Sequence, residues 1–181
     1  MITIISGTNR PDSSTLKVAR AVESIYRNNE VKTQLLDLQE LPSEIYDPSS
    51  YSNKPEGFDI FTKAVLDSEG LVVVTPEYNG GPPGALKYFI DMLPFPESFE
   101  HRPVAFIGLA AGMWGALRPV EQLQQIFGYR NAHIFPDRVF LPGIMSMLSD
   151  EAKLKSSQEW ELVEKQCKDF AAYARTLNKK E

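Results

Sequence analysis

The sequence predicts an α/β domain of the doubly wound class, in which a parallel sheet is covered by helices on both sides. Two observations favour this class. Short apolar runs alternate along the chain with amphipathic segments, which are long enough to be the crossover helices of βαβ units. Residues 70–75 (GLVVVT) are apolar without alternation, which is typical of a strand buried on both faces of a parallel sheet.

Five strands are predicted from apolar, β-branched composition. They cover residues 1–6, 31–38, 70–75, 104–109 and a short stretch over 132–135. Helices between them are predicted from apolar residues at helical spacing. They cover residues 13–28, a segment marked by Phe58, Phe61 and Val65, a segment beginning at Pro83, residues 115–127 and the final stretch 149–177. Residues 41–57, rich in Pro, Ser, Tyr and Asn, are predicted to be a long loop.

Composition narrows the class of protein. A chain of 181 residues with 43% hydrophobic and 24% charged residues fits one globular domain, residues 1–181. The net charge of −5 argues against binding to nucleic acid or to an anionic membrane surface. No apolar run has the length of a membrane span, and the first strand begins at Met1 without a secretory signal. We therefore expect a cytoplasmic protein.

The residues that usually bind metals or form disulfides are scarce. Cys167 is the only cysteine, which excludes an internal disulfide and a cysteine-based metal cluster. The two histidines, His101 and His133, lie far apart in the sequence and lack the spacing of metal ligands. We expect no metal site.

A hydroxyl-rich loop connects the first strand to the first helix. It contains Thr8 and Arg10 and ends in Ser13, Ser14 and Thr15 at the start of the helix. The N-terminus of a helix presents free backbone N–H groups and a positive dipole end, which favour a phosphate. The hydroxyl groups and Arg10 could donate further hydrogen bonds to it. The alternative is an ordinary N-cap, and the loop has neither P-loop nor dinucleotide-fingerprint spacing.

A second distinctive loop, residues 75–87 (TPEYNGGPPGALK), follows the third strand. Its glycines allow the backbone to approach a flat ligand closely, and Tyr78 offers an aromatic face. The alternative is a tight strand-to-helix connection shaped by Pro and Gly. Ligands of doubly wound sheets bind outside the carboxyl ends of the strands, where both loops are expected. Together they favour a ligand with a phosphate at one end and a ring at the other.

These two loops resemble those of the NAD(P)H-dependent FMN reductase family of flavodoxin-like proteins, which includes quinone, azo-dye and chromate reductases. The first loop matches the family's G-S-x-R-x-x-S-x-N pattern through Gly7, Thr8, Arg10, Ser13 and Thr15. The second matches its longer and more specific P-E-Y-N-G-x-x-P-G-x-L-K signature through Pro76, Glu77, Tyr78, Asn79, Gly80, Pro83, Gly84, Leu86 and Lys87.

The resemblance implies a flavodoxin-like three-layer sandwich with a five-stranded parallel sheet in the order 2-1-3-4-5. It also implies an FMN cofactor, reduction by NADPH or NADH, a small-molecule electron acceptor, and a homodimer or homotetramer. No protein side chain is expected to be catalytic, since the cofactor carries the reaction. The residues expected to bind the cofactor are Thr8, Arg10, Ser13, Ser14 and Thr15 for the phosphate, Pro76, Glu77, Tyr78, Asn79 and Gly80 for the ring, and Gly112 in a third, glycine-rich turn.

The chain departs from the family pattern at several positions. Asp12 stands where glycine is common and brings a negative charge near the expected phosphate, and Thr15 replaces the usual Asn. In the third turn Ala110 replaces a frequent serine, while Met113 and Ala116 replace glycines.

Two neighbouring residues, Trp114 and Arg118, have open roles. Trp114 could stack at the mouth of the site or pack in an interface or the core. Arg118 could meet a phosphate of NADPH or a carboxylate.

Two other functions remain open at this level. One is a non-enzymatic FMN electron carrier of the flavodoxin type, although the sequence lacks the T-x-T-G-x-T loop and the strongly acidic composition of such carriers. The other is a nucleotide- or phosphate-binding protein without a redox role. The sequence does not identify the electron acceptor.

Overall fold

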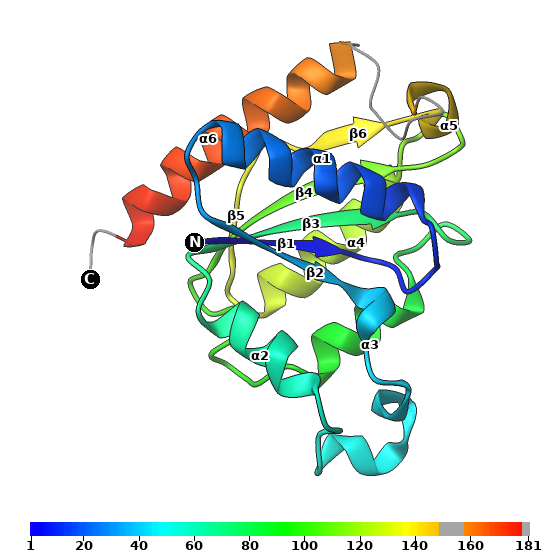
Figure 1. The fold of residues 1–181 in the computed structure, drawn as a ribbon, viewed down its shortest axis with the longest axis vertical. Coiled ribbons are helices and arrows are strands. Elements are labelled where there is room, and N and C mark those ends of the chain that lie inside the picture. Colours follow the sequence, from blue (N-terminus) through cyan, green and yellow to red (C-terminus); the bar gives the residue numbers. More distant parts are fainter. Residues whose placement is uncertain (149–157, 179–181) are drawn as a thin grey trace.

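A computed structural model describes residues 1–148 and 158–178 (Figure 1). The strands are β1 (Ile2–Ser6), β2 (Thr33–Asp37), β3 (Gly70–Pro76), β4 (Pro103–Leu109), β5 (His133–Ile134) and β6 (Val139–Leu141). The α-helices are α1 (Ser14–Asn28), α2 (Phe58–Leu66), α3 (Gly84–Met92), α4 (Leu117–Tyr129), α5 (Ile144–Met147) and α6 (Gln158–Asn178).

The strands form one parallel sheet in the order β2-β1-β3-β4-β5, and β6 also pairs with β4. Helices α1 and α6 pack on one face, and α2, α3 and α4 pack on the other. Every residue of β1, β3 and β4 is buried, because both faces of these strands are covered. The predicted fold class and strand order are confirmed.

Differences from the prediction concentrate at the β4 edge and in one connection. The expected strand over residues 132–135 is the two-residue β5, and neither β6 nor α5 was predicted. Pro136 follows this region and cannot donate to a strand ladder, which ends β5 early. The predicted fourth helix is displaced by two residues at each end. Of the expected final helix over 149–177, residues 149–157 lie outside the described part of the chain, and α6 confirms the rest.

The connection between β2 and α2, predicted as a long loop, contains three short 3₁₀ helices. They are η1 (Leu38–Glu40), η2 (Ser43–Tyr46) and η3 (Pro48–Tyr51). Two of them start at an aspartate whose carboxylate accepts a backbone N–H two residues later: Asp37 from Gln39 at 3.1 Å, and Asp47 from Ser49 at 2.8 Å. These local bonds order a segment that has no sheet or α-helix ladder.

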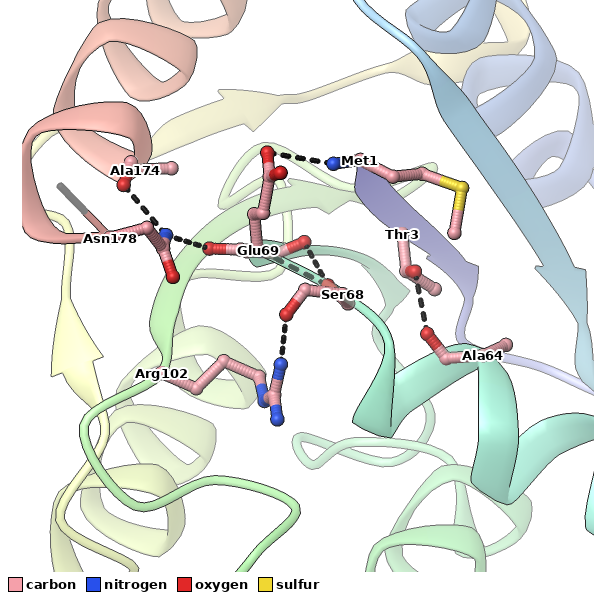
Figure 2. Close-up of polar contacts among 9 residues, drawn as sticks. Met1, Thr3, Ala64, Ser68, Glu69, Arg102, Ala174 and Asn178 are labelled. Atoms are coloured by element: carbon pink, nitrogen blue, oxygen red, sulfur yellow. Dashed lines mark hydrogen bonds and ion pairs between the residues drawn. The ribbon is translucent and has the colours of Figure 1, made fainter. Parts of the chain in front are cut away.

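The amino ends of the central strands are fastened by polar contacts around Ser68 and Glu69 (Figure 2). The Met1 ammonium group lies 2.7 Å from the Glu69 carboxylate, and the Asn178 amide at the end of α6 donates to the Glu69 carbonyl at 2.9 Å. The Arg102 guanidinium donates to the carbonyl of Ser68 and, at 2.7 Å, to that of Ser98. These contacts lie at the opposite end of the sheet from the carboxyl ends of the strands.

Within the described part of the chain, no helix combines the length and the apolar character required to cross a bilayer.

Candidate functional site

A cleft of about 670 Å³ opens at the carboxyl ends of β1, β3 and β4. Three segments line it: the loop from β1 into α1, the loop after β3, and the segment from the end of β4 together with α5 and Leu148. In doubly wound parallel sheets, ligands bind at the carboxyl ends of the strands where the strand order reverses, which here is between β1 and β3. The two loops singled out in the sequence are therefore brought together.

The first wall is the start of α1. Ser13 is its N-cap, and the Ser13 hydroxyl accepts a hydrogen bond from the Leu16 backbone N–H at 3.1 Å. Ser14 is half-buried, and its hydroxyl has only a weak acceptor, the Met145 sulfur at 3.7 Å. The first-turn amides point out of the helix end, and the Arg10 side chain lines the same part of the cleft. This wall therefore carries hydrogen-bond donors and a cation suited to an anion.

Asp12 has the backbone conformation that explains why glycine suits its position. Its φ of +51° lies in the left-handed region, which glycine adopts freely and which aspartate tolerates better than most residues. The Asp12 side chain is exposed and lines the rim of the cleft.

Thr8 connects the first loop to the second. Its side chain is fully buried, and its hydroxyl lies 2.8 Å from the Tyr78 hydroxyl. The same Thr8 oxygen accepts the backbone N–H of Arg10 at 3.2 Å. The bond joins the segments after two neighbouring strands, so it fixes the position of one loop against the other.

The second wall is shaped by a tight hairpin. Tyr78 and Gly81 exchange two backbone hydrogen bonds, of 3.0 and 3.1 Å, around Asn79 and Gly80. Both central residues have positive φ, +53° and +78°, which is the type I′ geometry that Asn-Gly favours. Gln122 of α4 holds the tip by donating to the Gly80 carbonyl at 3.1 Å. The glycine signal in the sequence therefore encodes a turn that presents Tyr78 to the cleft.

The third wall is apolar. The sequence analysis expected its first part, the turn after β4 that contains Ala110, and missed the part formed by Ile144, Met145 and Leu148. Leu109, Ala110 and Ala111 follow β4, and Ile144 and Leu148 face the same cleft together with Met145. This wall is joined by backbone bonds from Ala110 to the Leu141 carbonyl, at 3.1 Å, and from Ile144 to the Ala110 carbonyl, at 3.0 Å. Its signal in the sequence was the Pro-Gly pair at 142–143, where Gly143 has a φ of +58°.

The predicted site residues fall into two groups. Seven line the cleft: Arg10, Ser13, Ser14, Thr15, Pro76, Glu77 and Tyr78. The others lie beside it: Thr8 is buried beneath Tyr78, Asn79 and Gly80 form the hairpin turn, and the Gly112 carbonyl accepts from Gly143 at 3.3 Å. Trp114 is 56% exposed, and Arg118 is also exposed.

The chemistry of the cleft fits a ligand with a phosphate and an apolar ring. Donors and the cations Arg10 and Lys17 stand at the α1 end, where they balance the carboxylates of Asp12 and Glu77, and apolar side chains form the opposite wall. A second hollow of about 800 Å³ lies along η2 and η3, but three carboxylates, those of Glu44, Asp47 and Glu56, line it. Such a lining repels a phosphate. In the described ranges, no three His, Cys, Asp or Glu side chains are grouped so that they could hold a metal ion.

Comparison with known proteins agrees with this geometry. Residues 1–144 match the family model described as NADPH-dependent FMN reductase. The chain is 30% identical to a 2-hydroxy-1,4-benzoquinone reductase from Burkholderia sp., over 71% of this chain and 70% of that protein. It is also 30% identical to an NADPH azoreductase from Bacillus sp. (strain OY1-2), over 79% and 77% of the two chains.

Among solved structures, the fold resembles that of FerB, a flavoenzyme NAD(P)H:(acceptor) oxidoreductase from Paracoccus denitrificans. The TM-score is 0.78 at 18% identity, and the match covers 97% of both chains. The family match favours an enzyme over an electron carrier. The chain belongs to the family of NADPH-dependent FMN reductases, and it is an oxidoreductase that uses FMN and a reduced nicotinamide cofactor.

Proposed function

We propose that the protein transfers electrons from NADPH or NADH, through FMN held in the cleft, to a small quinone or azo compound. The observation that carries this proposal is the cleft itself, in which a hydroxyl-rich helix start with Arg10 faces an apolar wall. FMN, when bound, supplies the redox chemistry of the reaction. The two relatives that are 30% identical are named for a benzoquinone acceptor and for azo reduction, which supports this class of acceptor.

In this proposal the protein's own groups bind and orient. Arg10 and the hydroxyls of Ser13, Ser14 and Thr15 hold the phosphate, together with the first-turn amides of α1. Buried Thr8 positions this loop, because its hydroxyl bonds both to the Arg10 backbone N–H and to the Tyr78 hydroxyl.

The ring lies against the second and third walls. We assign it to Pro76, Glu77 and Tyr78, with Asn79 and Gly80 supplying the turn that holds them and Gly112 supporting the third wall. The apolar side chains of Ile144 and Leu148 exclude water from the ring. No side chain is assigned a catalytic role.

We also propose that residues 1–181 act as one flavodoxin-like domain in the cytoplasm and assemble as a homodimer or homotetramer. The support for assembly is an exposed aromatic surface beside a groove of about 370 Å³ between α3 and α4. Tyr129 is 82% exposed and lines this groove, and Phe95, 67% exposed, stacks with the groove residue Arg130. Large exposed aromatic rings are typical of protein interfaces.

Steady-state NADPH oxidation tests the proposed function. We expect oxidation that requires added FMN and speeds up when a benzoquinone or an azo dye is supplied. A carrier of the flavodoxin type would bind FMN without oxidising NADPH unless a partner reductase were added, and that result would refute the proposal. Light scattering on a size-exclusion column tests assembly, with Tyr129→Glu expected to shift the mass toward the monomer.

A further inference from the structure

The edge of the sheet beside β4 is interrupted where β5 ends and β6 begins. β5 pairs with Pro103 and Val104, and β6 pairs with residues 107–109 of β4. Between them β4 has two residues, whereas the chain opposite has four, 135–138, including Pro136. The extra residues leave the ladder, so the backbone pairing along this side of β4 is interrupted beside Ala105 and Phe106.

The Phe106 carbonyl faces this gap. The Val104 carbonyl accepts the Phe135 N–H at 2.8 Å and thus faces the edge. Phe106 is two residues further along the strand, so its carbonyl faces the same side. It lies in the core, and in the register that pairs Ile107 with Val139 it accepts the first backbone N–H of β6.

Gln166 of α6 supplies a second donor to this carbonyl and reaches across the gap. It is 2% exposed, and its side-chain amide donates to the Phe106 carbonyl at 3.0 Å and to the Asp137 carbonyl at 2.7 Å. The two N–H groups of one amide thereby bridge the carbonyls on either side of the gap. Lys165, the residue before it, adds contacts of 3.3 Å to the Asp137 carboxylate and 2.7 Å to that of Asp169.

The segment that Gln166 holds leads directly to the third wall of the cleft. β6 starts at Val139, two residues after Asp137, and its last residue, Leu141, accepts the Ala110 N–H. Three residues later Ile144 donates back to the Ala110 carbonyl and lines the cleft. A shift of the Asp137 segment would therefore move β6 and the wall together.

We propose that Gln166 is a positioning residue for the flavin cleft: it bridges the break in the edge strand and so fixes the register of β6 and the place of the α5 wall. The part of this proposal that concerns flavin rests on the proposed function above. The part that concerns the wall depends only on the hydrogen bonds of Gln166.

Hydrogen–deuterium exchange of the purified protein tests the wall directly. Gln166→Met keeps the length of the side chain but removes both donors. We expect the amides of Ala110 and Ile144 to exchange about tenfold faster, whereas those of β1 and β3 are unchanged, because loss of two hydrogen bonds loosens the wall and not the centre of the sheet. The same substitution at exposed Gln158, at the start of α6, is the matched control.

Two results would overturn the proposal. One is equal acceleration throughout the sheet, which indicates a merely structural role, and the other is unchanged exchange at Ala110 and Ile144. If Gln166→Met does not fold, Gln166→Asn replaces it; the amide is retained, but the side chain is one methylene too short to reach both carbonyls, and the same local acceleration is expected.

FMN titration separates this inference from the proposed function. If the wild type binds FMN, Gln166→Met should bind it several-fold more weakly while Gln158→Met binds it normally, and equal affinities would overturn the role in the cleft. If the wild type does not bind FMN, the proposed function fails, and the exchange data still decide whether Gln166 positions the wall.

Discussion

The Thr8–Tyr78 bond gives a specific prediction for flavin binding. Tyr78→Phe keeps the ring that lines the cleft and removes the hydroxyl that lies 2.8 Å from the Thr8 hydroxyl. The Thr8 hydroxyl also accepts the Arg10 N–H. Without its partner on Tyr78 it should hold the loop between β1 and α1, which is proposed to bind the phosphate, less firmly. A neutral hydrogen bond contributes about 1 kcal/mol, which corresponds to about a fivefold change in an equilibrium constant. We expect FMN to bind about fivefold more weakly.

Riboflavin distinguishes an effect on the phosphate loop from an effect on the ring. Because riboflavin lacks the phosphate, its affinity for Tyr78→Phe should equal that for the wild type. Both affinities are measured by quenching of flavin fluorescence. The control is Tyr88→Phe, which removes a hydroxyl from the tyrosine cluster with Tyr46 and Tyr51.

A double-mutant cycle with Thr8→Val tests the coupling itself. If the two side chains act through their shared bond, the double variant loses less FMN affinity than the sum of the single losses. Additive losses, or an equal loss of affinity for riboflavin and FMN in Tyr78→Phe, would refute the reasoning.

Three further predictions concern stability. Glu30 has a φ of +57° at the C′ position that ends α1, so Glu30→Gly should raise the free energy of unfolding by about 1 kcal/mol and the Tm by about 3 °C. Asn131→Gly, at the equivalent position of α4, should raise the Tm less, because asparagine tolerates positive φ better than glutamate does. Equal gains in a thermal melt would contradict this. Burial raises the pKa of Cys167 from 9.0 to about 12, so ionisation of the thiol favours unfolding: its contribution is complete below pH 9 and is lost as the pH rises toward 12. In urea unfolding from pH 8 to 10, Cys167→Val should lose less stability than the wild type, and parallel losses would contradict this. A Cβ at Gly108 would lie 2.6 Å from the Gly115 carbonyl oxygen, so Gly108→Ala should lower the free energy of unfolding by about 2 kcal/mol. Gly84→Ala, where a Cβ meets open space, should not lower it. Equal midpoints of urea unfolding for the two variants would show that the turn around Gly115 moves to make room for the methyl group.

The fold could be predicted because its strongest signals are local. The run at 70–75 is apolar throughout, so its burial on both faces follows from composition, and the order of strands and helices then restricts the topology. The loops after the first and third strands were also marked by local composition, and both were expected at the carboxyl ends of the strands, where they lie.

The parts that were missed depend on residues distant in sequence. β6 has three residues, too few for a periodic pattern, and it forms by pairing with residues 107–109 of β4, earlier in the chain. The apolar wall at Ile144 requires contact with Ala110, 34 positions earlier, so the Pro-Gly pair at 142–143 indicates a turn but not this contact. The bond between Thr8 and Tyr78 is likewise a tertiary contact, although each residue was predicted as part of the site.

An anaerobic titration of the FMN-loaded protein with NADPH tests the central claim most directly. The account predicts that the visible absorption band of the flavin bleaches and returns when air or a quinone is admitted. A bound flavin that neither NADPH nor NADH bleaches would contradict it, and so would a protein that cannot be loaded with FMN.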